Sequence, residues 1–409
     1  MISYEEALAA ILDQCTRLPA EEVPLEMAQG RFLAEPLFAS ADLPRFDCSS
    51  VDGFGLRLSD AQGASPKNPV TLKIAGVAHA GATVEGDLQP RTCIKLMTGT
   101  AVSSGVEAVI MREDVEESDD FVVLRNPARP GENIRLKGGD CRKGEMIAEA
   151  GSKLDPPLIA LHAAQGLAHA VATCVPRVSL LATGDEVVLP GAPIAAGQIY
   201  DSNLAALEAA VQLLGLKLEH AFHCKDDLSE IVEKINGFTD TSQIILSAGG
   251  VSAGDRDFVR EACMRLGMRI VFHGVAIKPG KPTLFATYRC SDGNTGLFFG
   301  LPGNPVAALL SFVKLVCPAI ERLTGAIPKS HRRGFARLTG GIARQAQRLE
   351  FVRGIAGYSE NGIEVRPMAG RDSHLLRGLF QANCLIAFPR ERDILQEGEV
   401  VEIEWLPWN

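Results

Sequence analysis

Short apolar runs alternate with segments of helical apolar spacing between residues 177 and 325. The apolar runs predict strands at 178–182, 221–224, 243–247, 269–273, 284–287 and 297–300. The helical spacing predicts helices at 204–214, 226–236, 258–266 and 306–316. Ser202 or Asn203 is expected to cap the first of these helices, and Asp226 or Asp227 the second. This alternation predicts a mostly parallel sheet covered by helices on both faces.

The N-terminal segment 3–18 has the apolar stripe of an amphipathic helix, which Pro19 should end. Ser3 and Glu6 have the spacing of a capping box. Residues 25–39 are predicted to be partly helical, and two prolines open a further helix at 156–166. We expect this further helix to pack against the N-terminal one, which would give a discontinuous helical domain.

Two other regions have the texture of β structure. Residues 46–139 contain short apolar runs at 70–74, 92–96, 108–111 and 121–124, which predict a small, mostly β domain. The acidic residues at 113–120 favour a solvated hairpin over a metal site. Residues 330–409 predict a second small β domain or barrel. The resulting division is 1–45 with 140–175, then 46–139, 176–326 and 327–409.

Composition narrows the class of protein. A net charge of −9 and an aromatic content of 6% argue against a nucleic-acid-binding surface. The ten cysteines are scattered singly, which indicates reduced thiols and a cytoplasmic location. The N-terminus lacks a signal-peptide pattern and the apolar runs are too short to cross a bilayer, so we expect no membrane association.

Four glycine- or proline-rich loops follow predicted strands, at 183–186, 248–255, 278–282 and 301–305. In open α/β sheets ligands bind beyond the carboxyl ends of the strands. Glycine lets backbone N–H groups approach an anion, and Lys278 and Lys281 add positive charge. The loop at 248–255 could also be an ordinary tight turn, and the loop at 278–282 a solvated basic turn. Together the four loops predict a site for a phosphate-bearing small molecule.

The same loops carry carboxylates beside the expected phosphates: Asp185, Glu186, Asp255 and Asp257. A carboxylate repels phosphate, so a divalent cation is the natural mediator, and Mg²⁺ prefers oxygen ligands, water and substrate phosphates. Capping of a helix is the alternative role for Asp255 and Asp257. Neither a Walker A sequence nor a dinucleotide-binding fingerprint is present, which argues against ordinary ATPases and NAD dehydrogenases.

Several motifs follow one another along the chain: the stretches at 43–55, 95–100 and 133–140, the four loops, and the motif at 350–353. In this order they resemble the molybdopterin molybdenumtransferases, the family of bacterial MoeA proteins and the gephyrin E domain. The resemblance implies a three-layer α/β/α domain of molybdopterin-binding type, with a small β domain, an extended discontinuous helical domain and a C-terminal β-barrel-like domain. It also implies insertion of molybdate into adenylylated molybdopterin, with release of AMP and support from Mg²⁺. Tungstate, a tetrahedral dianion of near-equal size, fits equally well.

The resemblance further implies a homodimer whose cleft lies between the sheet domain of one chain and the region of Asp52 in the other. Catalytic roles carry over to Asp52, Glu186, Thr98 and Asp140, with Asp52 and Glu186 as metal ligands. Substrate-binding roles carry over to Arg135, Thr183, Gly184, Asp185, Ser247, Gly249, Gly250, Val251, Ser252, Asp255, Asp257, Lys278, Lys281, Pro302, Asn304, Pro305, Arg353 and Ser373. The resemblance also implies a molybdopterin adenylyltransferase or a molybdoenzyme chaperone as a partner.

Two departures from the family pattern concern Phe54, where a tyrosine is usual, and the stretch 372–374, where a Gly-Ser-Gly-like sequence is usual. The alternative functions are a molybdopterin adenylyltransferase, a gephyrin-like scaffold and a nucleotide pyrophosphatase. The histidines, His223 among them, show no spacing of paired ligands and favour structural positions.

Overall fold

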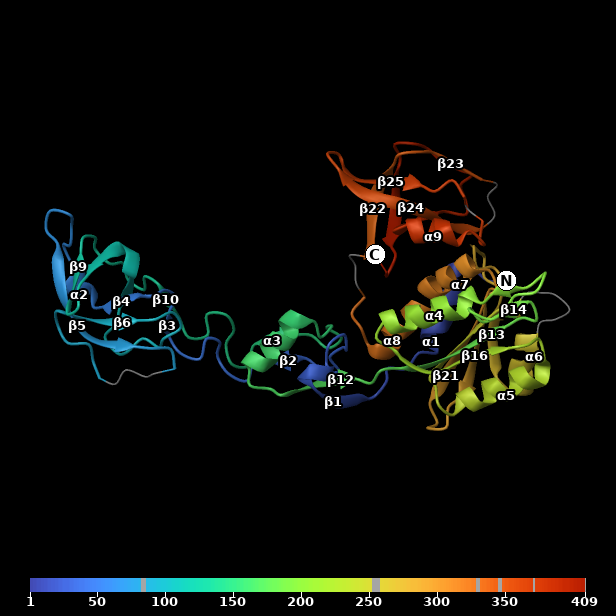
Figure 1. Cartoon of the computed structure of the whole chain (residues 1–409), viewed down its shortest axis with the longest axis horizontal. Coiled ribbons are helices and arrows are strands. Elements are labelled where there is room, and N and C mark those ends of the chain that lie inside the picture. Colours follow the sequence, from blue (N-terminus) through green and yellow to red (C-terminus); the bar gives the residue numbers. More distant parts are fainter. Residues whose placement is uncertain (82–85, 252–257, 329–331, 345–347, 371, 409) are drawn as a thin grey trace. The chain divides into compact units, whose positions relative to one another are not determined.

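The computed structural model describes residues 1–409 except 82–85, 252–257, 329–331, 345–347, 371 and 409. The chain forms two compact units (Figure 1). The first comprises Met1–Glu35, Ala150–Pro156 and His169–Asn409, and the second comprises Pro36–Glu149 and Pro157–Ala168. The four-domain division stays a prediction beside these two units.

The first unit contains a six-stranded sheet in the order β16-β13-β17-β21-β20-β18. Its strands are β13 (Arg177–Thr183), β16 (Lys217–Cys224), β17 (Ile244–Ala248), β18 (Arg269–His273), β20 (Leu284–Arg289) and β21 (Thr295–Leu301). The pairings of β13, β16, β17 and β21 are parallel, and β20 is antiparallel to both of its neighbours. Strand β18 therefore runs in the same direction as β21, which confirms a mostly parallel sheet.

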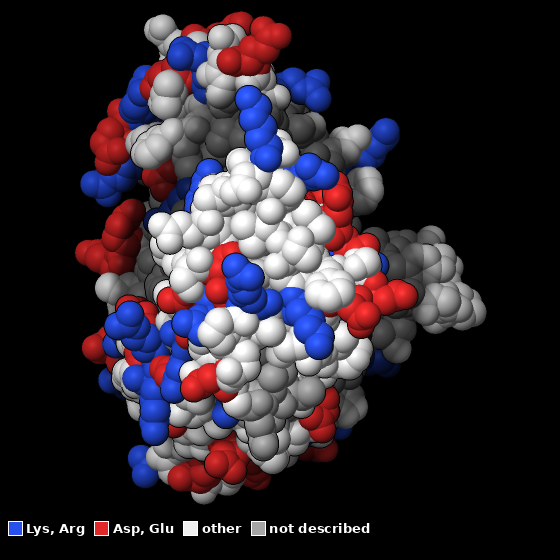
Figure 2. Space-filling model, turned by 90° about the vertical axis from the view of Figure 1, so that its left-hand side faces the viewer, with Lys and Arg blue, Asp and Glu red and all other residues white. Residues whose placement is uncertain are grey.

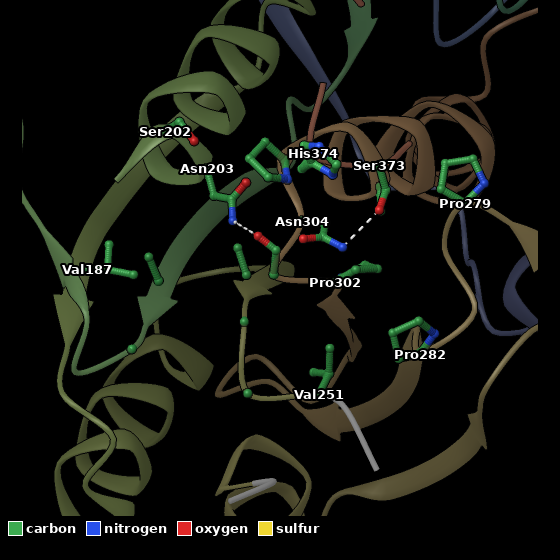
Figure 3. A pocket seen from close by; sticks show the side chains of 18 of the residues that line it. Val187, Ser202, Asn203, Val251, Pro279, Pro282, Pro302, Asn304, Ser373 and His374 are labelled. Atoms are coloured by element: carbon green, nitrogen blue, oxygen red, sulfur yellow. Dashed lines mark hydrogen bonds between the residues drawn. The ribbon is translucent and has the colours of Figure 1, made fainter. Parts of the chain in front are cut away.

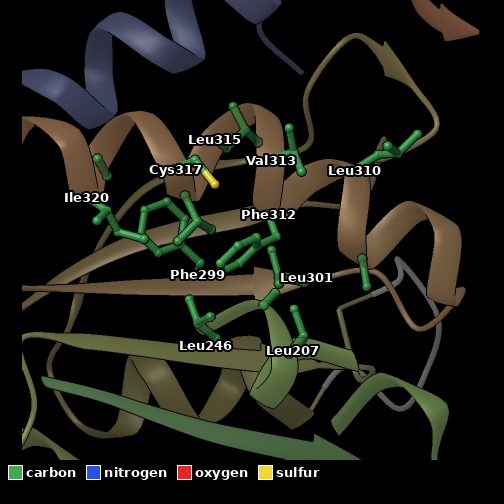
Figure 4. Packing of buried hydrophobic residues seen from close by; sticks show 14 of the residues in the cluster. Leu207, Leu246, Phe299, Leu301, Leu310, Phe312, Val313, Leu315, Cys317 and Ile320 are labelled. Carbon is green, nitrogen blue, oxygen red and sulfur yellow. The ribbon is translucent and has the colours of Figure 1, made fainter. Parts of the chain in front are cut away.

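Helices cover both faces of this sheet. One face packs against α1 (Tyr4–Asp13), α4 (Ser202–Leu213), α7 (Pro305–Ser311), the π-helical turn η3 (Phe312–Val316) and α8 (Cys317–Thr324). The other face packs against α5 (Leu228–Thr239) and α6 (Phe258–Arg265). Successive strand residues serve opposite faces, as Leu246 and Ile245 do. Figure 4 shows Leu246 and Phe299 of the sheet facing Phe312 and Cys317.

Two details of these helices differ from the sequence prediction. Asp201, and neither Ser202 nor Asn203, is the N-cap of α4, because its carboxylate accepts the N–H of Leu204. The helix predicted to end at 316 continues through η3 and α8 to Thr324. The capping box on α1 is confirmed, and the apolar stripe of α1 packs against that of α8 in the α/β core. The packing of α1 against the helix at 156–166 stays a prediction.

The predicted helical region outside the α/β core is largely extended. Strand β1 (Ala20–Pro24) pairs antiparallel with β12 (His169–Thr173). Residues 25–39 contain only the 3₁₀ turn η1 (Leu25–Met27) and strand β2 (Leu37–Phe38), which pairs with β11 (Met146–Ala148). The helix predicted at 156–166 is present as α3 (Pro156–Ala164).

The second unit is built on a sheet in the order β7-β4-β6-β5-β9-β8. Its strands are β4 (Gly53–Leu56), β5 (Val70–Ala78), β6 (Thr92–Leu96), β7 (Ala108–Met111), β8 (Val115–Glu117) and β9 (Phe121–Leu124). A separate pair is formed by β3 (Cys48–Ser49) and β10 (Ile134–Arg135). The unit also contains the short helices α2 (Leu58–Ala61) and η2 (Arg112–Asp114). Strands β8 and β9 form the predicted acidic hairpin. Phe54 is fully buried in the core, so a ring without a hydroxyl suits this position.

The C-terminal part of the first unit is a closed barrel of β24, β25, β22, β28 and β26, in which β26 pairs back to β24. Its strands are β22 (Arg333–Leu338), β24 (Leu349–Ser359), β25 (Gly362–Pro367), β26 (Cys384–Phe388) and β28 (Val400–Trp405), accompanied by β23 (Ile342–Ala343), β27 (Ile394–Leu395) and helix α9 (Leu376–Gln381). Strand β19 (Ile277–Lys278) of the basic loop adds to β24 in parallel. This pairing joins the predicted basic loop to the barrel.

None of the ten cysteines, all of which are described, forms a disulfide. On the face drawn in Figure 2, lysine and arginine side chains are intermixed with aspartate and glutamate around an uncharged area. That face differs from the continuous basic surface typical of nucleic-acid-binding domains. Within the described part of the chain, the helices are all too short or too polar to span a bilayer.

Candidate active site

A cavity of about 970 Å³ lies at the carboxyl ends of β13, β17 and β21, where the sequence predicted a ligand site. Residues from all four predicted loops line it, together with the N-terminal end of α4 and the 372–376 segment. The predicted site residues that it brings together are Thr183, Gly184, Glu186, Gly249, Gly250, Val251, Lys278, Lys281, Pro302, Asn304, Pro305 and Ser373. Figure 3 shows Val251, Pro302, Asn304 and Ser373 around the space.

The loop after β17 requires glycine. Gly249 and Gly250 have φ values of +92° and +65°, where L side chains are strained. A Cβ atom on Gly249 would lie 2.7 Å from the carbonyl oxygen of Thr183, so the two loops are in close contact. Ser252, Asp255 and Asp257 of the same loop lie outside the described residues.

Replacing Gly249 by alanine should lower the free energy of unfolding by about 1–2 kcal/mol from the backbone conformation alone. The contact with Thr183 should add to this cost and raise KM, because both loops line the cavity and one of them must shift. Gly215 is the matched control, since it has φ +70° and a Cβ atom there would have no neighbour within 4 Å. Chemical denaturation of both variants should show the larger loss for Gly249→Ala. Equal losses would contradict the close contact.

Positive charge gathers on one side of the cavity. The Lys278 ammonium lies 3.3 Å from the Glu350 carboxylate, which is buried and also contacts Arg344. Lys281 is exposed on the same loop. Arg348 also lines the cavity and donates to the carbonyl of Ile277 at 3.3 Å. Arg348 was not predicted from the sequence, because only the pairing of β19 with β24 brings that residue to this loop.

The segment carrying Ser373 is held from two sides. The Asn304 amide donates to the Ser373 hydroxyl at 2.8 Å (Figure 3). The Arg353 guanidinium, predicted to bind substrate, is buried away from the cavity lining. It donates to the carbonyls of Gly370, Asp372 and Leu375, and burial lowers its pKa. Arg353 is therefore a positioning residue for this segment.

Two further residues predicted to bind substrate do not line the cavity. Ser247 is fully buried in β17, one residue before the strand ends. Asp185 accepts the backbone N–H of Asp226 at 3.1 Å and so ties two strand-end loops together. Its neighbour Glu186 does line the cavity.

The remaining predicted site residues lie in the second unit. The Asp52 carboxylate accepts hydrogen bonds from the backbone N–H and the hydroxyl of Thr98, both at 2.7 Å. These bonds, and the nearby Arg112 charge, lower the pKa of Asp52. Arg135 is exposed on β10, opposite Cys48, and Asp140 is exposed, with its backbone N–H bonded to Leu43. Asp52 and Thr98 are therefore hydrogen-bonded to each other, and these bonds favour the ionised form of the Asp52 carboxylate.

Comparisons with known proteins agree with the fold. Residues 2–166 match the MoeA N-terminal region (domain I and II), residues 179–322 a probable molybdopterin binding domain, and residues 336–406 the MoeA C-terminal region (domain IV). The chain therefore belongs to the class of transferases that act in molybdenum cofactor biosynthesis. Matches along its whole length favour this class over an adenylyltransferase built on the sheet domain alone.

The chain is 32% identical to a molybdopterin molybdenumtransferase of Haemophilus influenzae, over 100% of this chain and 99% of that protein. It is 31% identical to the Staphylococcus aureus protein of the same name, over 98% of this chain and 95% of that one. A crystal structure of the molybdopterin biosynthesis MoeA protein from Pyrococcus horikoshii OT3 superposes with a TM-score of 0.82 at 29% identity, covering 99% and 100% of the two chains. The chain belongs to the molybdopterin molybdenumtransferase family.

Proposed function

We propose that this protein inserts molybdate into the dithiolene of adenylylated molybdopterin and releases AMP. The observation that carries the proposal is the cavity into which four strand-end loops converge, with glycine backbone on one loop and lysine on another. Backbone N–H groups beside Gly249 and Gly250 suit the substrate phosphates. Lys278, Lys281 and Arg348 suit a tetrahedral dianion, to which the Ser373 hydroxyl adds a hydrogen-bond donor.

A divalent cation is part of this proposal. The described residues contain no group of three or more His, Cys, Asp or Glu side chains placed to hold a metal ion by themselves. Glu186, Asp226 and Asp372 nevertheless supply carboxylates around the cavity. Mg²⁺ commonly takes one or two carboxylates and completes its shell with water and substrate phosphates, so this donor set fits. When bound, Mg²⁺ would neutralise charge on the phosphates during release of AMP.

Turnover assays distinguish this function from its rivals. The purified protein should release AMP from adenylylated molybdopterin only when molybdate is present. Release of AMP without molybdate would indicate a nucleotide pyrophosphatase instead. Formation of adenylylated molybdopterin from ATP and molybdopterin, without molybdate insertion, would indicate an adenylyltransferase. Tungstate should compete with molybdate, because both are tetrahedral dianions.

We also propose a cytoplasmic homodimer in which Asp52 and Thr98 of one chain act with Glu186 of the other. Support comes from the family membership and from the ionised state of Asp52, which suits a role in catalysis. Cysteines without disulfides agree with a reducing compartment. In this proposal a molybdopterin adenylyltransferase donates the pterin to the protein, and a molybdoenzyme chaperone accepts the product from it.

Mixing two inactive variants tests the shared site. In a random mixture of Asp52→Ala and Glu186→Ala chains, about half of the dimers are mixed, and each would contain one intact site. Activity should therefore return to about one quarter of the wild-type value after co-expression. Each variant expressed alone serves as the control. If both residues act from the same chain, every site carries a defect and the mixture stays inactive.

A further inference from the structure

Unpartnered buried acceptors lie at the N-terminal end of α4, on the cavity wall. Asp201 is 3% exposed and uses one carboxylate oxygen, Oδ1, to accept the N–H of Leu204 at 2.9 Å. Its other oxygen, Oδ2, is buried without a hydrogen-bond partner among the described residues. The nearest basic atom, Nδ1 of His223, is 3.6 Å away, which suits an ion pair but is too long for a hydrogen bond.

Asn203 presents a second acceptor two residues further on. Its Nδ2 atom donates to the carbonyl of Gly303 at 2.7 Å, which fixes the orientation of the amide (Figure 3). Its Oδ1 atom is buried and, within the described part of the chain, has no hydrogen-bond partner. Both Asp201 and Asn203 line the cavity. Leaving buried acceptors unpaired costs free energy, so such atoms are usually satisfied by water or by a ligand.

A carboxylate oxygen and an amide oxygen on the same helix turn suit a ligand edge with two adjacent N–H donors. The 2-amino-4-oxo ring of a pterin has such an edge, formed by its 2-amino group and N3–H. The base of AMP fits less well, because its pairing edge places an acceptor beside a single amino group. In Figure 3, Ser202 and Asn203 lie on one side of the cavity, and Pro279 and Pro282 of the basic loop on the other.

We propose that Asp201 and Asn203 recognise the pterin ring of the substrate through its 2-amino and N3–H groups. This inference rests on the proposed function, since it assumes that the cavity takes a pterin. The pterin would then lie against α4, and the oxyanion would lie towards Lys278 and Lys281 on the basic side. Asp201 would act as both helix cap and specificity determinant, with one oxygen for each task.

The substitution Asp201→Asn separates these two tasks. Asparagine caps helices as well as aspartate, so Oδ1 can still accept from Leu204, while Oδ2 becomes an amide donor. The probes are 6-hydroxymethylpterin and 6-hydroxymethyllumazine, which has an oxygen in place of the 2-amino group. Wild-type protein should bind the pterin at least about tenfold more tightly, and Asp201→Asn should remove or reverse that preference. Fluorescence titration of the two ligands measures the ratio.

Asp227→Asn is the matched control, because Asp227 caps α5 in the same way but does not line the cavity. It should leave the pterin-to-lumazine ratio and the affinity for AMP unchanged. Asn203→Ala is a second test that keeps the Asp201 cap, and it should weaken pterin binding by about fivefold. If Asp201→Asn lowers thermal stability but leaves the ratio intact, the carboxylate is only an ion-pair partner of His223 and the inference is wrong.

Molybdate-dependent AMP release by the wild-type protein, measured in parallel, separates the two proposals. Turnover without any dependence of the ligand ratio on Asp201 would overturn the pterin site and leave the proposed function standing. A ratio that depends on Asp201, in a protein that does not release AMP with molybdate, would support the pterin site and overturn the proposed function.

Discussion

Asp52→Asn should lower kcat by a factor of about 10²–10⁴, the range for removal of a positioned acid–base group. In the folded protein two donors from Thr98 hold this carboxylate, and they lower its pKa. Asparagine keeps the size of the side chain but cannot carry the negative charge. The fold should be unaffected, because Asp52 lies at the surface of its unit. Steady-state AMP release and thermal denaturation measure the two effects separately.

Asp60→Asn is the control for this prediction. Asp60 lies in the same unit, is also a carboxylate, and accepts the backbone N–H of Arg91 at 3.0 Å. Activity close to wild type is expected for it. A similarly large loss in both variants would show that the effect of Asp52→Asn is not specific to the proposed catalytic position.

Thr98→Val extends the prediction to pH. A carboxylate with a lowered pKa stays ionised to more acidic pH, so activity that needs ionised Asp52 persists there. Loss of the Thr98 hydroxyl removes one of the two donors and raises the pKa of Asp52, while the backbone donor remains. The acid limb of kcat/KM should therefore move to higher pH, and an unmoved limb would assign that limb to another group.

The sequence predicted the position of the cavity because strand direction alone decides where loops meet. The strands β13, β17, β18 and β21 all point the same way, so their loops converge even though β20 is reversed. Helices with a strong apolar stripe were also predictable, including the capping box of α1 at Ser3 and Glu6. Local patterns contain this information, since each depends only on neighbouring residues.

Contacts between distant segments were not predictable in this way. The stripe of α1 predicts a helix but does not identify its partner, which is α8. Arg348 reaches the cavity because β24 of the barrel pairs with β19 of the basic loop. Arg353, five residues later in β24, is instead buried and donates to carbonyls of the 370–375 segment. Which charged residue faces a ligand and which supports a loop depends on this long-range packing.

Glu350→Ala should lower the free energy of unfolding by about 3–5 kcal/mol, the usual cost of removing one partner from a buried ion pair. The Glu350 carboxylate lies 3.3 Å from both Lys278 and Arg344, and the Arg344 side chain is only 4% exposed. Without Glu350 the Arg344 charge remains buried with carbonyl oxygens as its acceptors. Lys278 would lose its ion-pair partner in the basic loop, so KM for molybdate should rise as well.

Glu399→Ala provides the matched comparison, because Glu399 also pairs with an arginine, Arg392, but both side chains are partly exposed. Exposed pairs contribute about 0–1 kcal/mol, so this variant should be near wild type in stability and in KM.

Replacing Arg344 and Glu350 together by methionine should recover much of the stability lost in Glu350→Ala, since no unpaired charge then remains. The double variant should still bind molybdate weakly, because Lys278 has lost its partner. Equal denaturation midpoints for Glu350→Ala and Glu399→Ala would contradict a structural role for the buried carboxylate. If the double variant recovers stability but not KM, Glu350 has two separate roles, one in folding of the barrel and one in positioning of the basic loop.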